Sequence, residues 1–166
     1  MFKKSFPPII AHDPRVLILG SLPGDRSLIE NQYYAHPQNR FWPMMTAFLN
    51  GNHDANYNER VDLLQKNGIC LWDVCKSAKR AGSMDTDILQ EVPNDIALLL
   101  DQYPSISSIL FNGQKAQQLF DRHHRRRTDI HYHTLPSTSP ANARSNKSQL
   151  IQVWKVINEL ITFPSK

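Results

Sequence analysis

Four short segments with apolar or alternating side chains stand out in the hydrophobic pattern of the chain, and the first of them stops abruptly at a glycine. They span residues 15–19, 69–74, 106–111 and 130–135. Their β-branched content and abrupt ends predict buried strands. Segments with helical periodicity lie between and beyond them and predict helices over residues 40–49, 59–66, 94–102, 114–123 and 147–161. Strands alternating with helices predict a three-layer α/β/α sandwich around a parallel, mainly four-stranded sheet.

The remaining stretches predict connections and a simple domain organisation. Residues 76–90 are polar and interrupted by glycine, so we expect a surface loop or lid there. A chain of 166 residues without an internal repeat is long enough for one domain with a sizeable core. We therefore expect a single domain over residues 1–166.

Composition narrows the possible partners only slightly. The chain has 19 Lys and Arg against 15 Asp and Glu, a formal charge of +4 that permits a polyanionic partner without requiring one. It has no apolar stretch of membrane-spanning length and no signal-peptide pattern, so we expect no membrane partner and a cytoplasmic protein, most simply a monomer. Cys70 and Cys75 offer too few ligands for a zinc or iron–sulfur site, and a reduced, buried pair is the expected alternative. We expect no metal and no cofactor.

Polar or flexible residues follow all four predicted strands. They are Gly20 to Leu22, Asp73, Asn112 with Gly113, and residues 136–138. In open parallel sheets, ligands bind at the carboxyl ends of the strands. The sequence therefore predicts that these four strand ends ring one pocket.

Three segments of the chain form a recognisable set. GSLPG stands at residues 20–24, YYAHPQNRFW at 33–42 and LPSTSPANA at 135–143. In order and spacing they resemble the three active-site segments of the uracil-DNA glycosylase superfamily, and most closely those of its mismatch-specific and hypoxanthine-DNA glycosylase branches. One position differs from the mismatch branch, where an Asn in GxNPG orients the attacking water. This chain has Leu22, which can hold no water, and in this respect it resembles the hypoxanthine branch.

The resemblance implies a set of residues around an extruded base. The amide of Asn39 would take over the water-orienting role, Asn112 would meet the edge of the base, and Tyr34 would stack on it. The predicted catalytic residues are thus Asn39 and Asn112, and the predicted base-binding residues are Gly20, Ser21, Leu22, Pro23, Gly24, Asp25, Tyr34 and Asp73. Each has a plainer alternative: Asn39 as a helix N-cap, Asn112 as part of an Asn-Gly turn, Asp25 as a surface turn residue, and Tyr34 as a core residue with Tyr33 as the stacking ring.

The third segment and its surroundings predict contacts to DNA. Hydroxyl groups can bind phosphate oxygens, and the prolines of residues 135–143 stiffen a loop that could wedge into a duplex. The predicted DNA-binding residues are His36, Ser137, Thr138, Ser139, Arg144 and Lys147. A plain Ser/Thr turn is the alternative, and the basic run at residues 123–127 is more typical of a solvated helix end.

These residues suit hydrolysis of an N-glycosidic bond, which needs placed amides and a bound water rather than a nucleophilic side chain. The sequence thus predicts a monofunctional DNA glycosylase acting on DNA that contains a deaminated base, with hypoxanthine favoured and uracil possible. A lesion-binding module with weak or no catalysis is the alternative, and an enzyme that uses GSLPG to cradle a small-molecule phosphate is a weaker third.

Overall fold

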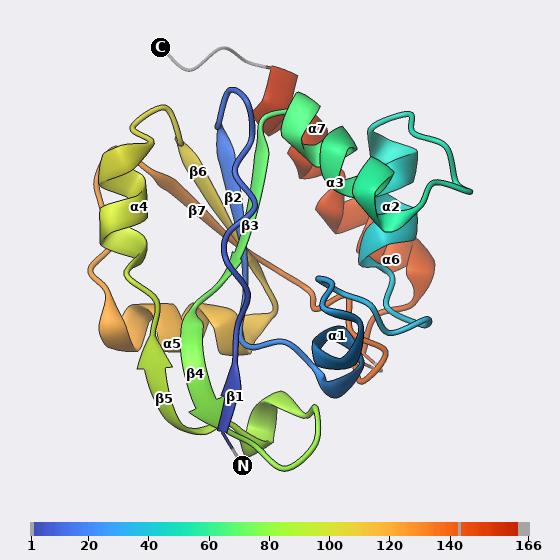
Figure 1. The fold of residues 1–166 in the computed structure, drawn as a ribbon. Helices are drawn as coiled ribbons and strands as arrows, with labels where there is room; N and C mark the ends of the chain where they lie inside the picture. The colour runs from blue at the N-terminus through green and yellow to red at the C-terminus, as the bar shows by residue number, and fades with distance from the viewer. Residues whose placement is uncertain (1, 143, 163–166) are drawn as a thin grey trace.

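A four-stranded parallel sheet forms the centre of the protein in its computed structural model (Figure 1). The structure describes residues 2–142 and 144–162. The strands follow the order β3-β2-β6-β7 and pair in parallel. They are β2 (Val16–Gly20), β3 (Ile69–Asp73), β6 (Ser108–Asn112) and β7 (His131–Leu135). All four predicted strands are confirmed.

The central strand β2 shows why the protein has three layers. All five of its residues are buried, and successive side chains of a strand point to opposite faces. Leu17 and Leu19 pack in one apolar cluster, and Val16 and Ile18 pack in another. Two helices pack on the side of the first cluster, α4 (Ile96–Gln102) and α5 (Gln114–His123). Four helices pack on the side of the second cluster: α2 (Phe41–Phe48), α3 (Tyr57–Lys66), α6 (Lys147–Trp154) and α7 (Val156–Thr162). The helices lie on both sides of the sheet, which confirms the predicted α/β/α sandwich (Figure 1).

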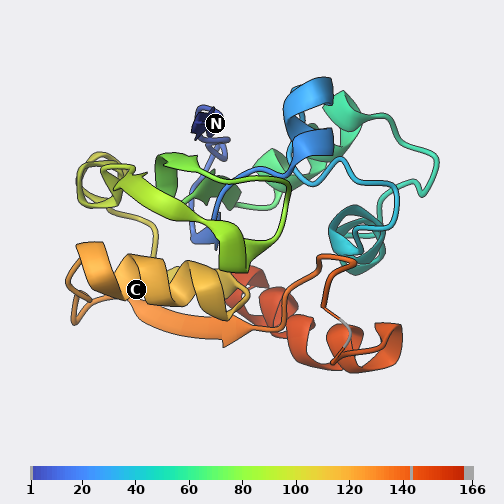
Figure 2. The same ribbon diagram turned by 90° about the horizontal axis from the view of Figure 1, so that it is seen from below.

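A second, antiparallel sheet corrects the prediction of a surface loop over residues 76–90. Its order is β1-β4-β5, with β1 (Phe2–Lys4), β4 (Cys75–Lys79) and β5 (Leu89–Pro93). The pattern of β4 misled the prediction because only Cys75 and Ala78 of this strand are buried. The strand β5 runs beside α5 (Figure 2), and Arg122 of α5 forms an ion pair with Glu91 of β5. Only residues 80–88, which include a short 3₁₀ turn (Asp85–Asp87), form the expected connection.

The helix boundaries differ from the predicted ones in three places. α3 begins before residue 59 because the Asn56 side chain accepts a hydrogen bond from the Glu59 N–H in a capping box. The expected single helix over 147–161 is interrupted at Lys155, between α6 and α7, without a glycine or proline to mark the break. A short helix α1 (Asp25–Glu30) forms directly after the first motif. Within the described ranges, no helix has the length and apolar character that crossing a membrane requires.

Candidate active site

The carboxyl ends of the four parallel strands surround one cavity. Gly20 ends β2, Asp73 ends β3, Asn112 ends β6, and Ser137 and Thr138 follow β7, and all five line a cavity of about 240 Å³. A cavity of about 150 Å³ is enough to bind benzene, so this one has room for a nucleobase. The predicted pocket is therefore confirmed.

All the residues predicted to act on the base or bind it line this cavity. They are Gly20, Ser21, Leu22, Pro23, Gly24, Asp25, Tyr34, Asn39, Asp73 and Asn112. Of the predicted DNA-binding residues, His36, Ser137, Thr138 and Ser139 also line it. Arg144 instead lines a neighbouring groove of about 530 Å³ that shares Ser137 and Ser139 with the cavity, and Lys147 lines neither.

Two polar side chains crowd the first residue of the GSLPG turn, where glycine leaves room for both. A Cβ atom on Gly20 would lie 2.6 Å from Asp73 Oδ1 and 3.1 Å from Tyr34 Oη. The first distance is shorter than real Cβ contacts. The missing side chain thus lets a carboxyl group and a phenol approach the same point at the floor of the cavity.

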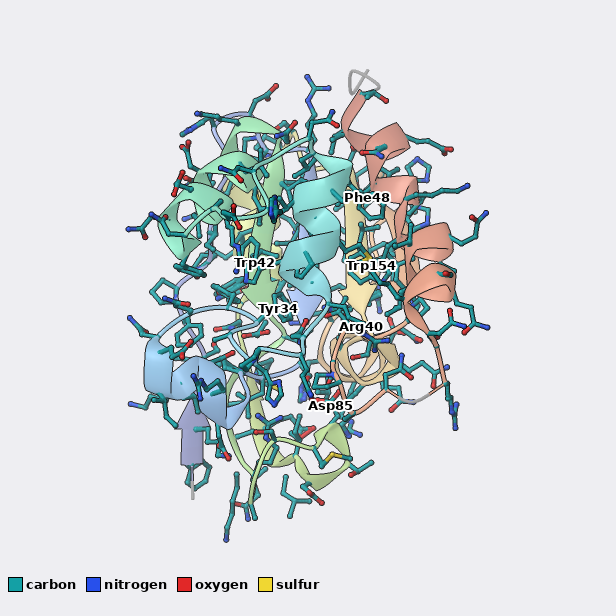
Figure 3. All side chains as sticks on the ribbon, turned by 90° about the vertical axis from the view of Figure 1, so that its right-hand side faces the viewer. Tyr34, Arg40, Trp42, Phe48, Asp85 and Trp154 are labelled. Carbon is teal, nitrogen blue, oxygen red and sulfur yellow. The ribbon has the colours of Figure 1, made fainter. Side chains whose placement is uncertain are left out.

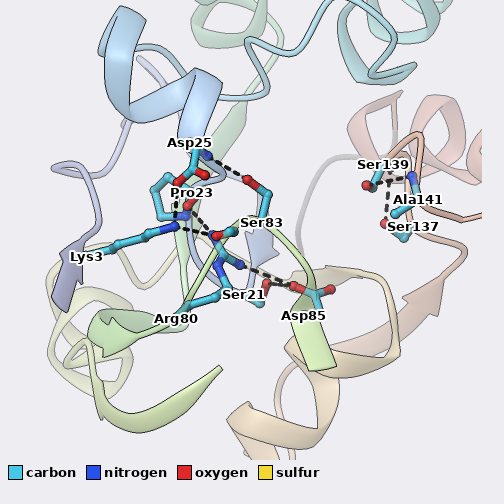
Figure 4. A network of polar contacts seen from close by, with 11 residues as sticks. Lys3, Ser21, Pro23, Asp25, Arg80, Ser83, Asp85, Ser137, Ser139 and Ala141 are labelled. Atoms are coloured by element: carbon cyan, nitrogen blue, oxygen red, sulfur yellow. Dashed lines mark hydrogen bonds and ion pairs between the residues drawn. The ribbon is translucent and has the colours of Figure 1, made fainter. Parts of the chain in front are cut away.

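The connection between β4 and β5 closes one side of the cavity, and sequence reasoning did not identify its residues. Ser83, Met84 and Asp85 all line the cavity. Ser21 donates a hydrogen bond of 2.6 Å to Asp85 Oδ1, and the Asp25 N–H donates one of 2.8 Å to Ser83 Oγ (Figure 4). These bonds hold residues 80–88 against the GSLPG turn.

Two buried cations support the same turn. Arg80 is 1% exposed, donates a hydrogen bond to the Pro23 carbonyl and lies 3.9 Å from Asp85 Oδ1. Lys3, from β1, pairs with Asp25 and donates to the Gly82 carbonyl (Figure 4). Asp25 is therefore an ion-pair partner at the start of α1, and its side chain is 52% exposed.

Asp73 is the most perturbed carboxyl group of the cavity. It is 4% exposed, and its Oδ2 has no hydrogen-bond partner among the described residues. Burial, followed by the negative charge of Asp85, raises the pKa of Asp73, Arg80 opposes both effects, and the resulting pKa is about 7. Near neutral pH, Asp73 therefore exists in both its protonated and its ionised form.

Tyr34 presents its ring to the cavity from an unusual backbone conformation. Its φ is +52°, in the left-handed region that non-glycine residues rarely adopt. Its ring stacks on Phe41 with the centroids 4.3 Å apart, lies 6.3 Å from the tilted ring of Tyr33, and borders the cavity (Tyr34 is labelled in Figure 3). Burial, followed by the charge of Asp73, raises the pKa of Tyr34, while the side chain of Asn112 acts in the opposite direction.

Tyr33, the alternative stacking residue, has a structural position. It is 4% exposed, and its hydroxyl donates a hydrogen bond of 2.8 Å to the Pro7 carbonyl. Its ring meets Phe6 edge-on with the centroids 5.2 Å apart. Although Tyr33 also borders the cavity, these contacts commit it to packing, so Tyr34 is the better candidate for stacking.

Asn39 lies directly before the N-cap residue Arg40 and also borders the cavity. Its Oδ1 accepts a hydrogen bond of 2.9 Å from the Phe41 N–H, so it caps the first turn of α2 from just outside the helix. Its side chain also borders the cavity, and Nδ2 has no partner within the described ranges. An amide oxygen has two lone pairs, so capping leaves one lone pair and both N–H groups for a ligand or water.

Asn112 links the end of β6 to the loop that follows β7. Its Nδ2 donates to Thr138 Oγ1 at 3.0 Å, and its Oδ1 accepts from the Thr138 N–H at 2.9 Å. Thr138 is fully buried, so its hydroxyl lies inside the loop instead of on a surface that phosphate could reach. Asn112 keeps one N–H and one lone pair for the cavity.

Arg40 holds residues 138–142 and Ser145, and sequence reasoning missed it. Its guanidinium donates to the carbonyls of Ser145 at 2.7 Å, Ser139 at 2.8 Å and Asn142 at 3.3 Å, and its backbone N–H donates to the Thr138 carbonyl (Arg40 is labelled in Figure 3). A positive charge at a helix N-terminus is unfavourable. That placement in the sequence was a signal that Arg40 has a partner outside its helix.

The remaining predicted DNA-binding residues lie at the rim. Ser137 and Ser139 accept hydrogen bonds from backbone N–H groups within their own loop, which is the Ser/Thr turn named as an alternative. His36 is exposed, and its Nδ1 accepts from the Gln38 N–H. Arg144 and Lys147 are exposed beyond them.

Other candidate groups lie away from this cavity. Cys70 and Cys75 are buried and unbridged, as predicted. Arg126, in the basic run, pairs with Asp121 and stacks on Tyr132 at the far end of α5. Among the described residues, no cluster of three or more His, Cys, Asp or Glu side chains could hold a metal ion.

Comparisons with known proteins agree with this geometry. The sequence model of the uracil DNA glycosylase superfamily matches residues 7–161. The chain is 41% identical over 150 residues to a hypoxanthine DNA glycosylase of Methanosarcina barkeri, covering 90% of this chain and 94% of the relative. It is 38% identical over 160 residues to the enzyme of the same name from Methanosarcina acetivorans, covering 95% and 98%.

A third relative is more distant, and one solved structure is similar throughout. The G/U mismatch-specific uracil DNA glycosylase of Schizosaccharomyces pombe is 31% identical over 96 residues, which are 57% of this chain and 28% of the relative. The solution NMR structure of a Methanosarcina acetivorans protein, described as a candidate uracil DNA glycosylase, superposes with a TM-score of 0.82 at 34% identity, covering 98% of this chain and 100% of that one. The resemblance inferred from three motifs is thus confirmed, and the chain belongs to the uracil DNA glycosylase superfamily.

Proposed function

We propose that this protein is a monofunctional DNA glycosylase that extrudes a deaminated base from DNA and hydrolyses its bond to deoxyribose, with hypoxanthine as the favoured base. The observation that carries the proposal is the shared cavity, because Asn39 and Tyr34 border one space large enough for a nucleobase. The two relatives of similar length are named hypoxanthine DNA glycosylases. Uracil is a second candidate substrate.

The side chains around the cavity divide the work of the reaction. The ring of Tyr34 stacks on the extruded base, an interaction of about 1–3 kcal/mol per base. The amide of Asn39 holds the attacking water beside the sugar, and Asn112 offers its remaining N–H and lone pair to the edge of the base. Leu22 is 6% exposed and apolar, so it shapes the cavity without binding water.

The loop after β7 and its neighbours hold the DNA in this proposal. Ser137, Ser139 and His36 lie at the rim, with Arg144 along the adjoining groove, and Lys147 adds a charge at the start of α6. We assign Thr138 to holding Asn112 instead of contacting phosphate, because it is fully buried. We further propose that the protein works as a monomer in the cytoplasm on DNA that contains the deaminated base.

The proposal includes base removal without strand cleavage. In the described part of the chain, no lysine lines the cavity, so no amine is placed to form a Schiff base with the sugar. The product is then an intact strand with an abasic site.

A gel assay tests the proposal. Duplexes with one deoxyinosine or one deoxyuridine are incubated with the protein, and alkali then cuts any abasic site. We expect alkali-dependent cleavage of the deoxyinosine strand and no cleavage without alkali. Intact strands for both lesions after alkali would refute the enzymatic function.

A lesion-binding module is the second candidate, and one observation favours it. The water-orienting amide of the mismatch branch is replaced by Leu22, and the oxygen of Asn39 is already engaged by the Phe41 N–H. Asn39→Ala separates the two functions, with Asn56→Ala as a matched control that removes a similar helix cap far from the cavity. A large loss of rate with retained DNA binding in Asn39→Ala alone supports the glycosylase. Lesion-selective binding by a parent protein that releases no base supports the module.

A further inference from the structure

A buried carboxyl oxygen at the floor of the cavity has no partner. Asp73 Oδ2 lacks a hydrogen-bond partner among the described residues, and the Asp73 side chain borders the cavity. Leaving a buried polar group unpaired costs about 1–3 kcal/mol, so such groups need an explanation. A ligand that reaches the floor would remove this cost.

The charges around Asp73 favour its protonated, neutral form. Lys3 pairs with Asp25, and Arg80 lies beside Asp85 (Figure 4). Each cation therefore already has a carboxylate partner other than Asp73. Asp73 is the third carboxyl group of the cluster and has no cation of its own, so the cluster is neutral only when Asp73 carries a proton.

We propose that Asp73 is the general acid of the reaction: its carboxyl group gives a proton to N7 of the hypoxanthine ring while the glycosidic bond breaks. This inference rests on the function proposed above. It makes Asp73 a catalytic residue that acts on the departing base, whereas Asn39 acts on the water.

The step balances without any further reactant. As the bond from C1′ to N9 breaks, its electron pair moves into the purine, and the proton passes from the Asp73 carboxyl group to N7. Hypoxanthine leaves as a neutral base, and Asp73 becomes a carboxylate. Water adds to C1′ and releases one proton to the solvent, from which Asp73 takes up another before the next turnover.

The chemistry of the two candidate bases makes this acid selective. A purine has a basic imidazole nitrogen at N7, and protonation there turns the base into a good leaving group. Uracil lacks such a nitrogen and leaves as an anion spread over its two carbonyl oxygens. A carboxylic acid at the cavity floor therefore assists a purine much more than uracil.

The surroundings of Asp73 set when it holds its proton. The groups that face it are Tyr33 and Tyr34 from the loop before α2, Cys75 and Arg80 around β4, and Asp85 from the 3₁₀ turn. The phenols and the thiol are neutral near pH 7, because their own pKa values are raised. Burial raises the pKa of Asp73 to about 7, with Asp85 raising it and Arg80 lowering it. The acid form is present below that pH and is lost above it.

The test compares the wild-type protein with Asp73→Asn in single-turnover excision from deoxyinosine DNA between about pH 5 and pH 9. Removing a general acid costs about 10²–10⁴-fold in rate. We expect that loss, a wild-type rate that falls as pH rises through about 7, and a flat profile for the variant. DNA containing 7-deaza-2′-deoxyinosine lacks N7, and we expect the wild-type protein to cleave it no faster than the variant does.

Asp85→Asn tests the same idea without changing Asp73. Removing the charge at position 85 lowers the pKa of Asp73, so the fall in rate should begin at a lower pH. Asp87→Asn is the matched control, because Asp87 is exposed on the same 3₁₀ turn and does not line the cavity. We expect its profile to match that of the wild type.

Several results would overturn the inference while leaving the glycosylase function intact. They are an Asp73→Asn variant that excises hypoxanthine at the wild-type rate, a variant that keeps the wild-type pH profile, and a wild-type advantage that persists on 7-deaza DNA. An unshifted profile for Asp85→Asn would also overturn it. A wild-type protein that releases no base from any substrate would instead refute the proposed function itself.

Discussion

The buried carboxyl group of Asp73 makes a prediction about stability that needs no substrate. The folded protein holds the pKa of Asp73 at about 7, against 3.8 in the unfolded chain. Between these values the unfolded chain has released its proton and the folded protein has kept it. Stability therefore decreases as pH rises through this window and stays at the lower level above pH 7. Asp73→Asn removes the titration, since an amide is neutral at every pH in this range.

The magnitude follows from the size of the shift. The pKa rises by about three units, and each unit corresponds to about 1.4 kcal/mol, which gives an upper value of about 4 kcal/mol. Asp73 is 4% exposed, so solvent screening reduces this free-energy difference only slightly. We expect the stability advantage of Asp73→Asn over the wild type to grow from near zero at pH 4 to as much as about 4 kcal/mol at pH 8.

Urea unfolding of both proteins at a series of pH values provides the measurement. All other titrations are shared and cancel in the difference between the two proteins. Asp87→Asn removes an exposed carboxyl group from a nearby turn and should show almost no pH-dependent difference from the wild type. If Asp73→Asn differs from the wild type by the same amount at every pH, Asp73 does not carry a raised pKa, and the reasoning fails.

Three further substitutions test the geometry of the cavity. Gly20→Ala places a methyl group against the Asp73 carboxyl, and we expect a loss of about 1–3 kcal/mol in unfolding free energy, with thermal unfolding as the measurement. Tyr34→Ala should weaken binding to DNA with an extruded base by about 1–3 kcal/mol in a binding titration, whereas Tyr34→Phe keeps the ring and should bind like the wild type. Arg40→Ala removes the bonds to Ser139, Asn142 and Ser145; we expect faster amide exchange at residues 138–142 and slower excision, while unchanged exchange would contradict the role assigned to Arg40.

The sequence was sufficient for the parallel sheet and for the position of the cavity. The strands β2 and β6 are mainly apolar, since helices cover both faces, and such a run is easily recognised, whereas only Leu135 of the edge strand β7 is buried. The rule that ligands bind at the carboxyl ends of parallel strands then placed Gly20, Asp73 and Asn112 together. Both inferences depend on local pattern and simple topology.

The parts that were missed depend on contacts between distant segments. β4 buries only Cys75 and Ala78, so its pattern resembled a polar loop. Arg80 and Asp85 lie more than 55 residues from Ser21 and Pro23, the turn residues they support. No local pattern reveals such pairs, and for this reason the sequence placed Asp73 correctly but could not show which charges surround it.

Leu22 and Asp73 together indicate how the site divides its catalytic effort. Cleavage of an N-glycosidic bond can be assisted at the water or at the departing base. Leu22 stands where the mismatch branch has an amide that orients the water, whereas Asp73, as proposed, supplies an acid to the departing base. A site that activates the leaving group suits a purine, which gains most from protonation, and needs less help in orienting water, for which Asn39 remains. The preference for hypoxanthine over uracil would then arise from the leaving-group chemistry of the base as well as from the shape of the cavity.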